Sequence, residues 1–172
     1  MNIQILDKTK KRKFIEKISY LGIEKFNYLL MRSGSEKLRA YSGSLSVDEI
    51  IRIWTEMRVE AIGLYFGKET EDETRLTLDA MHILKDQITK NIIEVNLEQE
   101  EQWFLGKDLE LTEEQREKYK DMQGFVAVKS DGDIIGNGKI SSDKKMVSNF
   151  LPKERRIRQS SFMSPNGQRK KD

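Results

Sequence analysis

The sequence predicts an α+β protein in which a mixed α/β unit, residues 1–88, precedes a small β-barrel, residues 89–158. Helix-like and strand-like patterns alternate irregularly in the first unit, which is typical of the α+β class. In the second unit, short strand-like runs follow one another with turn signals between them, which favours a small barrel. The chain has 172 residues, enough for two compact units. Residues 159–172 are rich in Ser, Gly, Pro and Lys and are expected to form a disordered basic tail.

The first unit is expected to open with a helix over residues 8–21. Its apolar residues have the spacing of one helical face: Phe14, Ile15, Ile18 and Leu21. Gly22 follows, a residue type that commonly ends a helix. Two strand-like runs, 26–31 and 38–41, are then separated by a Gly/Ser-rich stretch, so a hairpin is predicted there.

The clearest helix is predicted over residues 46–57. Ser46 and Glu49 have the spacing of a capping box. The apolar residues of this segment repeat at helical spacing and are expected to face a core: Val47, Ile50, Ile51, Trp54 and Met57. Residues 59–67 are expected to form a buried strand and residues 74–78 a half-buried one. Asp79 is then expected to cap a short helix.

The second unit is predicted to hold four strands, at residues 92–97, 124–129, 134–140 and 146–151. Thr112 is expected to cap a charged helix that ends near Lys120. Asp131-Gly132-Asp133 predicts a tight hairpin turn. Gly136 and Gly138 lack the third glycine and the following helix of a dinucleotide loop. They are interpreted as a bulge or a close backbone approach within a strand.

Charge is unevenly distributed along the chain. The net charge is +2, but residues 94–121 hold ten acids and four bases, whereas residues 144–172 hold nine bases and two acids. Such separation is typical of a polyanion-binding surface, although a charge run is also what a solvated face looks like. Guanidinium groups match phosphate oxygens with bidentate geometry. The candidate phosphate-binding residues are Lys139, Lys144, Lys145, Lys153, Arg155, Arg156 and Arg158.

Composition argues against several classes of function. The chain has no cysteine, so disulfides, thiolate metal sites and thiol catalysis are excluded. His82 is the single histidine, which leaves no credible catalytic triad or multi-histidine metal site. No enzymatic activity, catalytic residue, cofactor or metal is therefore expected. No apolar run approaches the roughly 18 residues of a membrane span, and no secretory signal is visible, so a cytoplasmic location is expected.

Several segments resemble the PUA-domain proteins of ribosome biogenesis in archaea and eukaryotes. Gly124-Phe-Val-Ala-Val-Lys129, with the run from Asp131 to Ile140, is similar to the final hairpin of PUA domains. Gly63-Leu-Tyr-Phe-Gly67-Lys68, Arg75-Leu-Thr-Leu78 and Trp103-Phe-Leu-Gly-Lys107 resemble the same proteins. The ending Leu151-Pro-Lys-Glu-Arg-Arg156 is similar to PUA-like modules related to Sun-type rRNA cytosine methyltransferases. The resemblance covers roughly residues 45–158.

This resemblance implies a pre-PUA domain over residues 1–88 and a PUA-type β-barrel over residues 89–158. It also implies RNA binding through the barrel, with rRNA, pre-rRNA or a tRNA-like structured RNA as the target. By position, that function falls on the seven bases named above. The partners it implies are RNA and either ribosome-assembly proteins or an rRNA methyltransferase, with neither DNA nor a membrane expected.

The related methyltransferases use cysteine nucleophiles, and this chain has no cysteine. The resemblance therefore favours a non-catalytic RNA-binding protein. The alternative is a protein-interaction scaffold, or a partner subunit of an rRNA-modifying enzyme, with little RNA affinity of its own. In either case the acidic stretch 94–121 would repel RNA and is a candidate surface for a basic protein.

Overall fold

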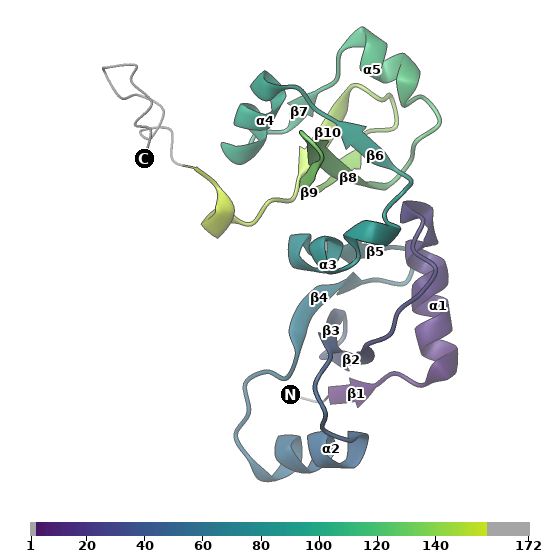
Figure 1. Ribbon diagram of the computed structural model, residues 1–172, viewed down its shortest axis with the longest axis vertical. Helices are drawn as coiled ribbons and strands as arrows, with labels where there is room; N and C mark the ends of the chain where they lie inside the picture. Colours follow the sequence, from purple (N-terminus) through teal and green to yellow (C-terminus); the bar gives the residue numbers. More distant parts are fainter. Residues whose placement is uncertain (1–2, 158–172) are drawn as a thin grey trace. The chain divides into compact units, whose positions relative to one another are not determined.

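The computed structural model describes residues 3–157 and divides the chain into two compact units, Met1–Ile92 and Ile93–Asp172 (Figure 1). Both units combine helices with strands, so the α+β class is confirmed. The predicted tail and Arg158 lie outside the described residues. No helix between residues 3 and 157 is long and apolar enough to cross a membrane.

The first unit is built on a five-stranded sheet with the order β1-β2-β3-β4-β5. Each strand pairs antiparallel with the next along the chain. The strands are β1 (Ile3–Ile5), β2 (Leu29–Ser33), β3 (Lys37–Tyr41), β4 (Leu64–Glu69) and β5 (Thr74–Leu76). The predicted hairpin joins β2 to β3, and Gly34 has φ +69° in its turn, a conformation that glycine adopts without strain.

The first predicted helix is confirmed as α1 (Lys8–Ile18), followed by the 3₁₀ turn η1 (Ser19–Leu21). Gly22 ends it in the left-handed conformation, φ +91°. Phe14 of α1 is fully buried and meets Phe26 and Phe66 edge to face, with ring centroids 5.3 and 6.5 Å apart. This aromatic cluster forms the centre of the first unit's core.

Helix α2 (Val47–Glu56) begins at the predicted capping box, but its apolar residues do not all face a core. Ile50 is fully buried, whereas Val47, Ile51 and Met57 are 39%, 46% and 62% exposed. The prediction that these apolar residues face a core is therefore wrong for most of them. Helical spacing shows which residues share a face, and it carries no information about how much of that face another element covers.

Two further predictions in the first unit need correction. Residues 59–63 form an irregular connection, and β4 begins only at Leu64. Gly63 has φ +74°, and a Cβ at this position would lie 2.5 Å from the Ala40 carbonyl oxygen, so a regular strand does not continue through it. Helix α3 (Leu78–Ile83) is capped by Thr77, whose hydroxyl accepts a hydrogen bond from the Ala80 N–H, and not by Asp79.

The second unit is built on a curled, half-barrel sheet with the order β6-β8-β9-β10-β7, which confirms a PUA-type fold (Figure 1). Its strands are β6 (Ile92–Glu94), β7 (Leu109–Glu110), β8 (Phe125–Ser130), β9 (Asp133–Ile140) and β10 (Met146–Asn149). Helices α4 (Leu97–Phe104) and α5 (Glu113–Lys118) accompany them. The predicted tight turn joins β8 to β9, with positive φ at both Asp131 and Gly132, as a type I′ turn requires.

The predicted strand 92–97 ends early because Asn96 starts a helix. Its side chain accepts a hydrogen bond from the Gln99 N–H at 2.9 Å. The Gln99 side-chain oxygen in turn accepts one from the Asn96 N–H at 3.2 Å, which completes a capping box. Helix α4 follows, and no helix was predicted there. Thr112 caps α5 as predicted.

Candidate nucleic-acid interface

Most of the described candidate bases lie at the two ends of strand β10. The remaining one, Lys139, lies on the neighbouring strand β9. Lys144 and Lys145 occupy the turn before β10, and Lys153, Arg155 and Arg156 follow it, on and just after the short helix η3 (Lys153–Arg155). The four residues of β10 span about 13 Å at the usual rise of a strand, and residues 150–152 lie between the end of that strand and Lys153. Lys139 lies on β9, opposite Ser148. The topology therefore makes two separate clusters from bases that are close in the sequence.

The turn cluster is largely bound within its own unit. The Lys144 ammonium donates to the Met122 carbonyl oxygen, and the side chain is half-buried. Lys145 is exposed, with its Nζ 4.0 Å from Asp143 Oδ2. The Ser141 hydroxyl donates to Asp143 at 2.6 Å and lowers the pKa of that carboxyl group, which keeps it ionised beside Lys145. Lys144 therefore helps to hold the turn, whereas the exposed Lys145–Asp143 pair contributes little and can exchange for a phosphate contact.

The cluster after β10 is held against the end of α4. The Arg156 Nε–H donates to the Leu151 carbonyl oxygen at 3.0 Å, and the Ile157 N–H donates to the Phe104 carbonyl oxygen at 2.8 Å. The Arg156 side chain lies on Gly106, where a Cβ would come within 2.5 Å of Arg156 Cδ. Arg156 is therefore half-buried and fixed in place, while Lys153 and Arg155 stay exposed.

Lys107 is a further base that the structure brings to this region and that sequence reasoning missed. Its carbonyl oxygen accepts a hydrogen bond from Asn149 Nδ2 at 3.0 Å, so the loop that carries it lies beside the end of β10. Its ammonium donates to Gln102 at 2.7 Å. Lys107 lies within the acidic stretch 94–121, and nothing in the sequence alone separates it from its acidic neighbours. We call Lys107, Lys153, Arg155 and Arg156 the Gly106 cluster.

An aromatic pair lies on the sheet beside Lys139. The rings of Phe125 and Phe150 are 5.8 Å apart with an interplanar angle of 64°, and both are half-buried. The Lys139 ammonium lies 5.3 Å from the centroid of the Phe125 ring, within the range of a cation–π contact. Half-exposed aromatic rings next to a base are the groups on which proteins stack unpaired nucleobases.

Acidic residues gather on the other elements of the second unit. A groove of about 570 Å³ includes Glu98, Asp108, Glu110 and Glu113, with Arg116 beside them. Glu94 accepts a hydrogen bond from Lys118 at 2.9 Å, and this contact lowers the pKa of Glu94.

Among residues 3–157, no group of three or more His, Cys, Asp or Glu side chains is placed to hold a metal ion.

Close packing in the core positions the sheet that carries these groups. Trp103 of α4 is fully buried, and its indole N–H donates to the Ile135 carbonyl oxygen at 3.2 Å. A Cβ at Gly136 would lie 2.4 Å from Trp103 Nε1, and one at Gly138 would lie 3.2 Å from the same ring. The predicted close approach at the two glycines is confirmed: the indole of Trp103 approaches Gly136, and Val147 of β10, at 2.4 Å from a Cβ built at position 138, approaches Gly138.

Comparison with known protein families assigns the second unit to a class of module. Residues 90–157 match the family model described as the methyltransferase RsmF PUA domain. The second unit is thus a PUA-like module, a type of domain that binds RNA, and it is similar to the module of that methyltransferase. The match covers less than half of the chain and leaves nearly all of the first unit outside it. No curated protein matches the chain.

Proposed function

We propose that the chain is a non-catalytic, cytoplasmic RNA-binding protein that binds rRNA or pre-rRNA during ribosome biogenesis or rRNA modification. One observation carries the proposal: a unit that matches a methyltransferase PUA domain carries the Gly106 cluster of bases beside the end of β10. The resemblance of the longer segment 45–158 to PUA proteins of ribosome biogenesis supports rRNA as the target.

The absence of a thiol supports a non-catalytic role. The related rRNA cytosine methyltransferases use cysteine nucleophiles, and these 172 residues contain no cysteine. His82, the single histidine, is exposed on α3. RNA binding of the proposed kind needs no cofactor, because phosphate and base contacts come from the side chains themselves.

We propose different tasks for the bases. Lys153 and Arg155, whose side chains are exposed, would contact phosphate oxygens, and the hydrogen bond from Arg156 to Leu151 supports a pre-ordered contact at Arg156. Pre-ordering of this kind lowers the entropy lost on binding. The Phe125–Phe150 pair offers an apolar surface for an unpaired base, with the Lys139 ammonium at its edge. Phosphate contacts position the RNA, and stacking favours single-stranded segments.

The test is a binding titration with the full chain and a fluorescent RNA hairpin that has a single-stranded extension. Wild-type affinity should fall steeply as KCl rises from about 50 to 200 mM, because bound counterions are released from the phosphates. Arg155→Ala with Arg156→Ala should weaken binding several-fold or more. The matched control is Arg52→Ala with Lys85→Ala, two exposed bases of the first unit. Absent or salt-insensitive binding by the wild-type protein contradicts the proposal.

Crosslinking in cells, followed by sequencing of the bound RNA, tests the choice of target. Enrichment of rRNA or pre-rRNA is expected over other abundant RNAs. A set of bound RNAs that follows cellular abundance argues for RNA binding without a role in ribosome biogenesis.

The second candidate is a protein-interaction scaffold or a partner subunit of an rRNA-modifying enzyme. The acidic groove around Glu98, Glu110 and Glu113 favours it, because such a surface repels RNA and suits a basic protein. A stable complex with a purified rRNA methyltransferase, together with absent RNA binding, would favour this function over the first.

A further inference from the structure

The densest positive charge among the described residues lies on helix α1 of the first unit. Five of the six residues from 8 to 13 are bases, a density that no other run of six within residues 3–157 reaches. The whole helix holds six bases and one acid. Residues 93–157 of the PUA-like unit hold eleven bases and fourteen acids. The described part of that unit is therefore acidic on balance, and its cationic surface is confined to local clusters.

We propose that α1 carries a second RNA-binding surface, formed by Lys8, Lys10, Arg12 and Lys13, which contact the phosphate backbone. We call these four residues the α1 basic surface. The identity of the polyanion as RNA rests on the proposed function. The surface itself is argued from the placement of charge on α1, which lies in the unit that the family match does not describe.

The position of these bases opposes the stability of the helix. A helix N-terminus carries a partial positive charge, so acids there are stabilising and bases are destabilising. Helices α2, α4 and α5 follow this rule, with acids in their first turns. In α1 the N-cap is Asp7, but the first turn that follows has no acid, and like charges at spacings of three and four residues repel one another. If this face served only solubility, acids in the first turn would make it equally soluble and would also stabilise the helix.

Contacts within the first unit separate the bases of α1 into two kinds. Lys11 donates to the Tyr28 carbonyl oxygen at 2.9 Å, and burial lowers its pKa. Lys17 donates to the Thr70 carbonyl oxygen at 3.0 Å and lies 3.3 Å from Glu69. These two bases hold the helix to its own unit.

The four bases of the α1 basic surface are exposed. Lys10 lies 3.9 Å from Asp7, and Arg12 lies 3.5 Å from Glu16, in pairs whose side chains are all more than two-fifths exposed. Such pairs contribute little and exchange readily for phosphate. The α1 basic surface is therefore available to a ligand.

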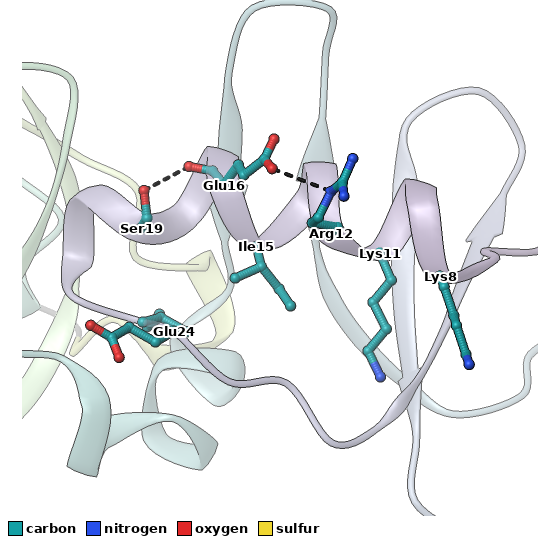
Figure 2. Close-up of a pocket in the computed structure, with 8 residues that line it drawn as sticks. Lys8, Lys11, Arg12, Ile15, Glu16, Ser19 and Glu24 are labelled. Carbon is teal, nitrogen blue, oxygen red and sulfur yellow. Dashed lines mark hydrogen bonds and ion pairs between the residues drawn. The ribbon is translucent and has the colours of Figure 1, made fainter.

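The α1 basic surface borders a groove on each side of the helix. Lys8 and Arg12 line one groove of about 490 Å³, and Lys10 and Lys13 line another of about 460 Å³. Figure 2 shows the first of these grooves, with the Lys8 and Lys11 side chains directed the same way as Ile15 and with Arg12 paired to Glu16. Bases on both sides of the helix can therefore contact the phosphates of an RNA strand that crosses its first two turns.

Burial of the apolar side of α1 argues for a nucleic acid, and against a membrane, as the ligand of the α1 basic surface. Basic amphipathic helices bind membranes by inserting an apolar face beneath the headgroups. The apolar residues Phe14, Ile18 and Leu21 are fully buried in the core of the first unit and cannot insert. What remains exposed is mainly charge, which is sufficient for phosphate contacts.

The test uses the full chain and the same RNA hairpin. The α1 variant replaces Lys8, Lys10, Arg12 and Lys13 with Gln, and the control variant replaces Lys25, Arg52, Lys85 and Lys90 with Gln. Both remove four exposed charges from the first unit. The α1 variant should bind at least tenfold more weakly, and the slope of log Kd against log [KCl] should fall by about 2 to 3. The control should stay within about twofold of wild type.

A thermal melt separates this role from a structural one. Removing bases from the helix N-terminus should leave the melting temperature unchanged or raise it by about 2–4 °C. An α1 variant that is better folded but binds RNA more weakly supports the proposal. An equal loss of affinity in the control variant shows an effect of net charge alone and overturns it.

The remaining outcomes distinguish this inference from the proposed function. Normal RNA binding by the α1 variant, while Arg155→Ala with Arg156→Ala still weakens it, overturns the α1 basic surface alone. No RNA binding by the wild-type protein overturns both. Binding of the wild-type chain to vesicles of phosphatidylcholine and phosphatidylglycerol, lost in the α1 variant without change in RNA affinity, assigns α1 to membranes and overturns the inference.

Discussion

The indole of Trp103 occupies the space that a side chain at position 136 would need. A Cβ at Gly136 would lie 2.4 Å from Trp103 Nε1 and 2.7 Å from Cζ2. Because Trp103 is fully buried and donates to the Ile135 carbonyl oxygen, it has little freedom to move away. The contact fixes α4 against β9 and so sets the position of the Gly106 loop that follows α4.

We expect Gly136→Ala to destabilise the PUA-like unit by about 1–3 kcal/mol, the usual cost of overpacking a core. Urea denaturation followed by tryptophan fluorescence measures this change. Ser148→Ala, an exposed position on β10, is the control and should change stability by less than about 0.5 kcal/mol. An unaltered free energy of unfolding in Gly136→Ala would show that Trp103 can be displaced without cost.

Glu69 of β4 is a buried carboxylate with two cationic partners. Its side chain is 9% exposed and contacts Lys17, at 3.3 Å, and Arg32. Glu69→Gln removes the charge and leaves Arg32 facing a neutral group. Because Arg32 is partly exposed to water, we expect a loss of about 1–3 kcal/mol, less than for a fully buried pair.

The chain offers a matched control for this change. Glu36 and Lys68 form an ion pair at 2.8 Å, with both side chains more than two-fifths exposed. Glu36→Gln should cost about 0–1 kcal/mol in the same denaturation experiment. Equal losses in the two variants would argue against a special role for the Glu69 site.

Within the Gly106 cluster, Arg155 and Arg156 should respond differently to substitution. Arg155→Gln should weaken RNA binding and change the melting temperature less than Arg156→Gln does, because contacts of an exposed side chain contribute little to stability. Arg156→Gln should weaken binding and also lower the melting temperature, because it removes the hydrogen bond to Leu151 and the contact with Gly106. Differential scanning fluorimetry and the RNA titration measure the two effects. Identical melting temperatures in the two variants would contradict the structural role of Arg156.

The stability of the first unit should decrease at alkaline pH because of Tyr20. Burial, with a smaller contribution from Glu73, raises the pKa of Tyr20 above its ordinary value near 10. The folded state thus holds the phenolic proton, which donates to the Thr74 carbonyl oxygen at 3.2 Å, after the unfolded state has released it. Stability is retained below pH 10 and falls above it by up to about 1.4 kcal/mol per pH unit.

Tyr20→Phe tests this prediction because it removes the titrating group. The variant should be less stable than wild type near pH 8, having lost one hydrogen bond, and the difference should shrink as the pH rises through 10 and beyond. Unfolding free energies from urea titrations at each pH measure the difference. A difference that stays constant with pH would show that Tyr20 does not titrate differently in the folded and unfolded states.

Features that depend on a few neighbouring residues were predicted well. The Ser46–Glu49 capping box, the Asp131-Gly132 turn and the cap at Thr112 all appear where the sequence places them. Helix α4 was missed, although Asn96 and Gln99 carry a capping signal, because the strand-like run before it was extended across its start.

The sequence by itself determined the order of most helices and strands, the PUA-like character of the second unit and the presence of dense basic runs. These properties follow from local hydrogen bonding and from side-chain periodicity, which act over a few residues. Only the tertiary structure decided which bases lie together. It separated Lys144 from Arg155 by the length of β10, brought Lys107 to the end of that strand and left Ile51 exposed. Such proximity and burial arise from packing between residues far apart in the chain, which local sequence patterns do not encode.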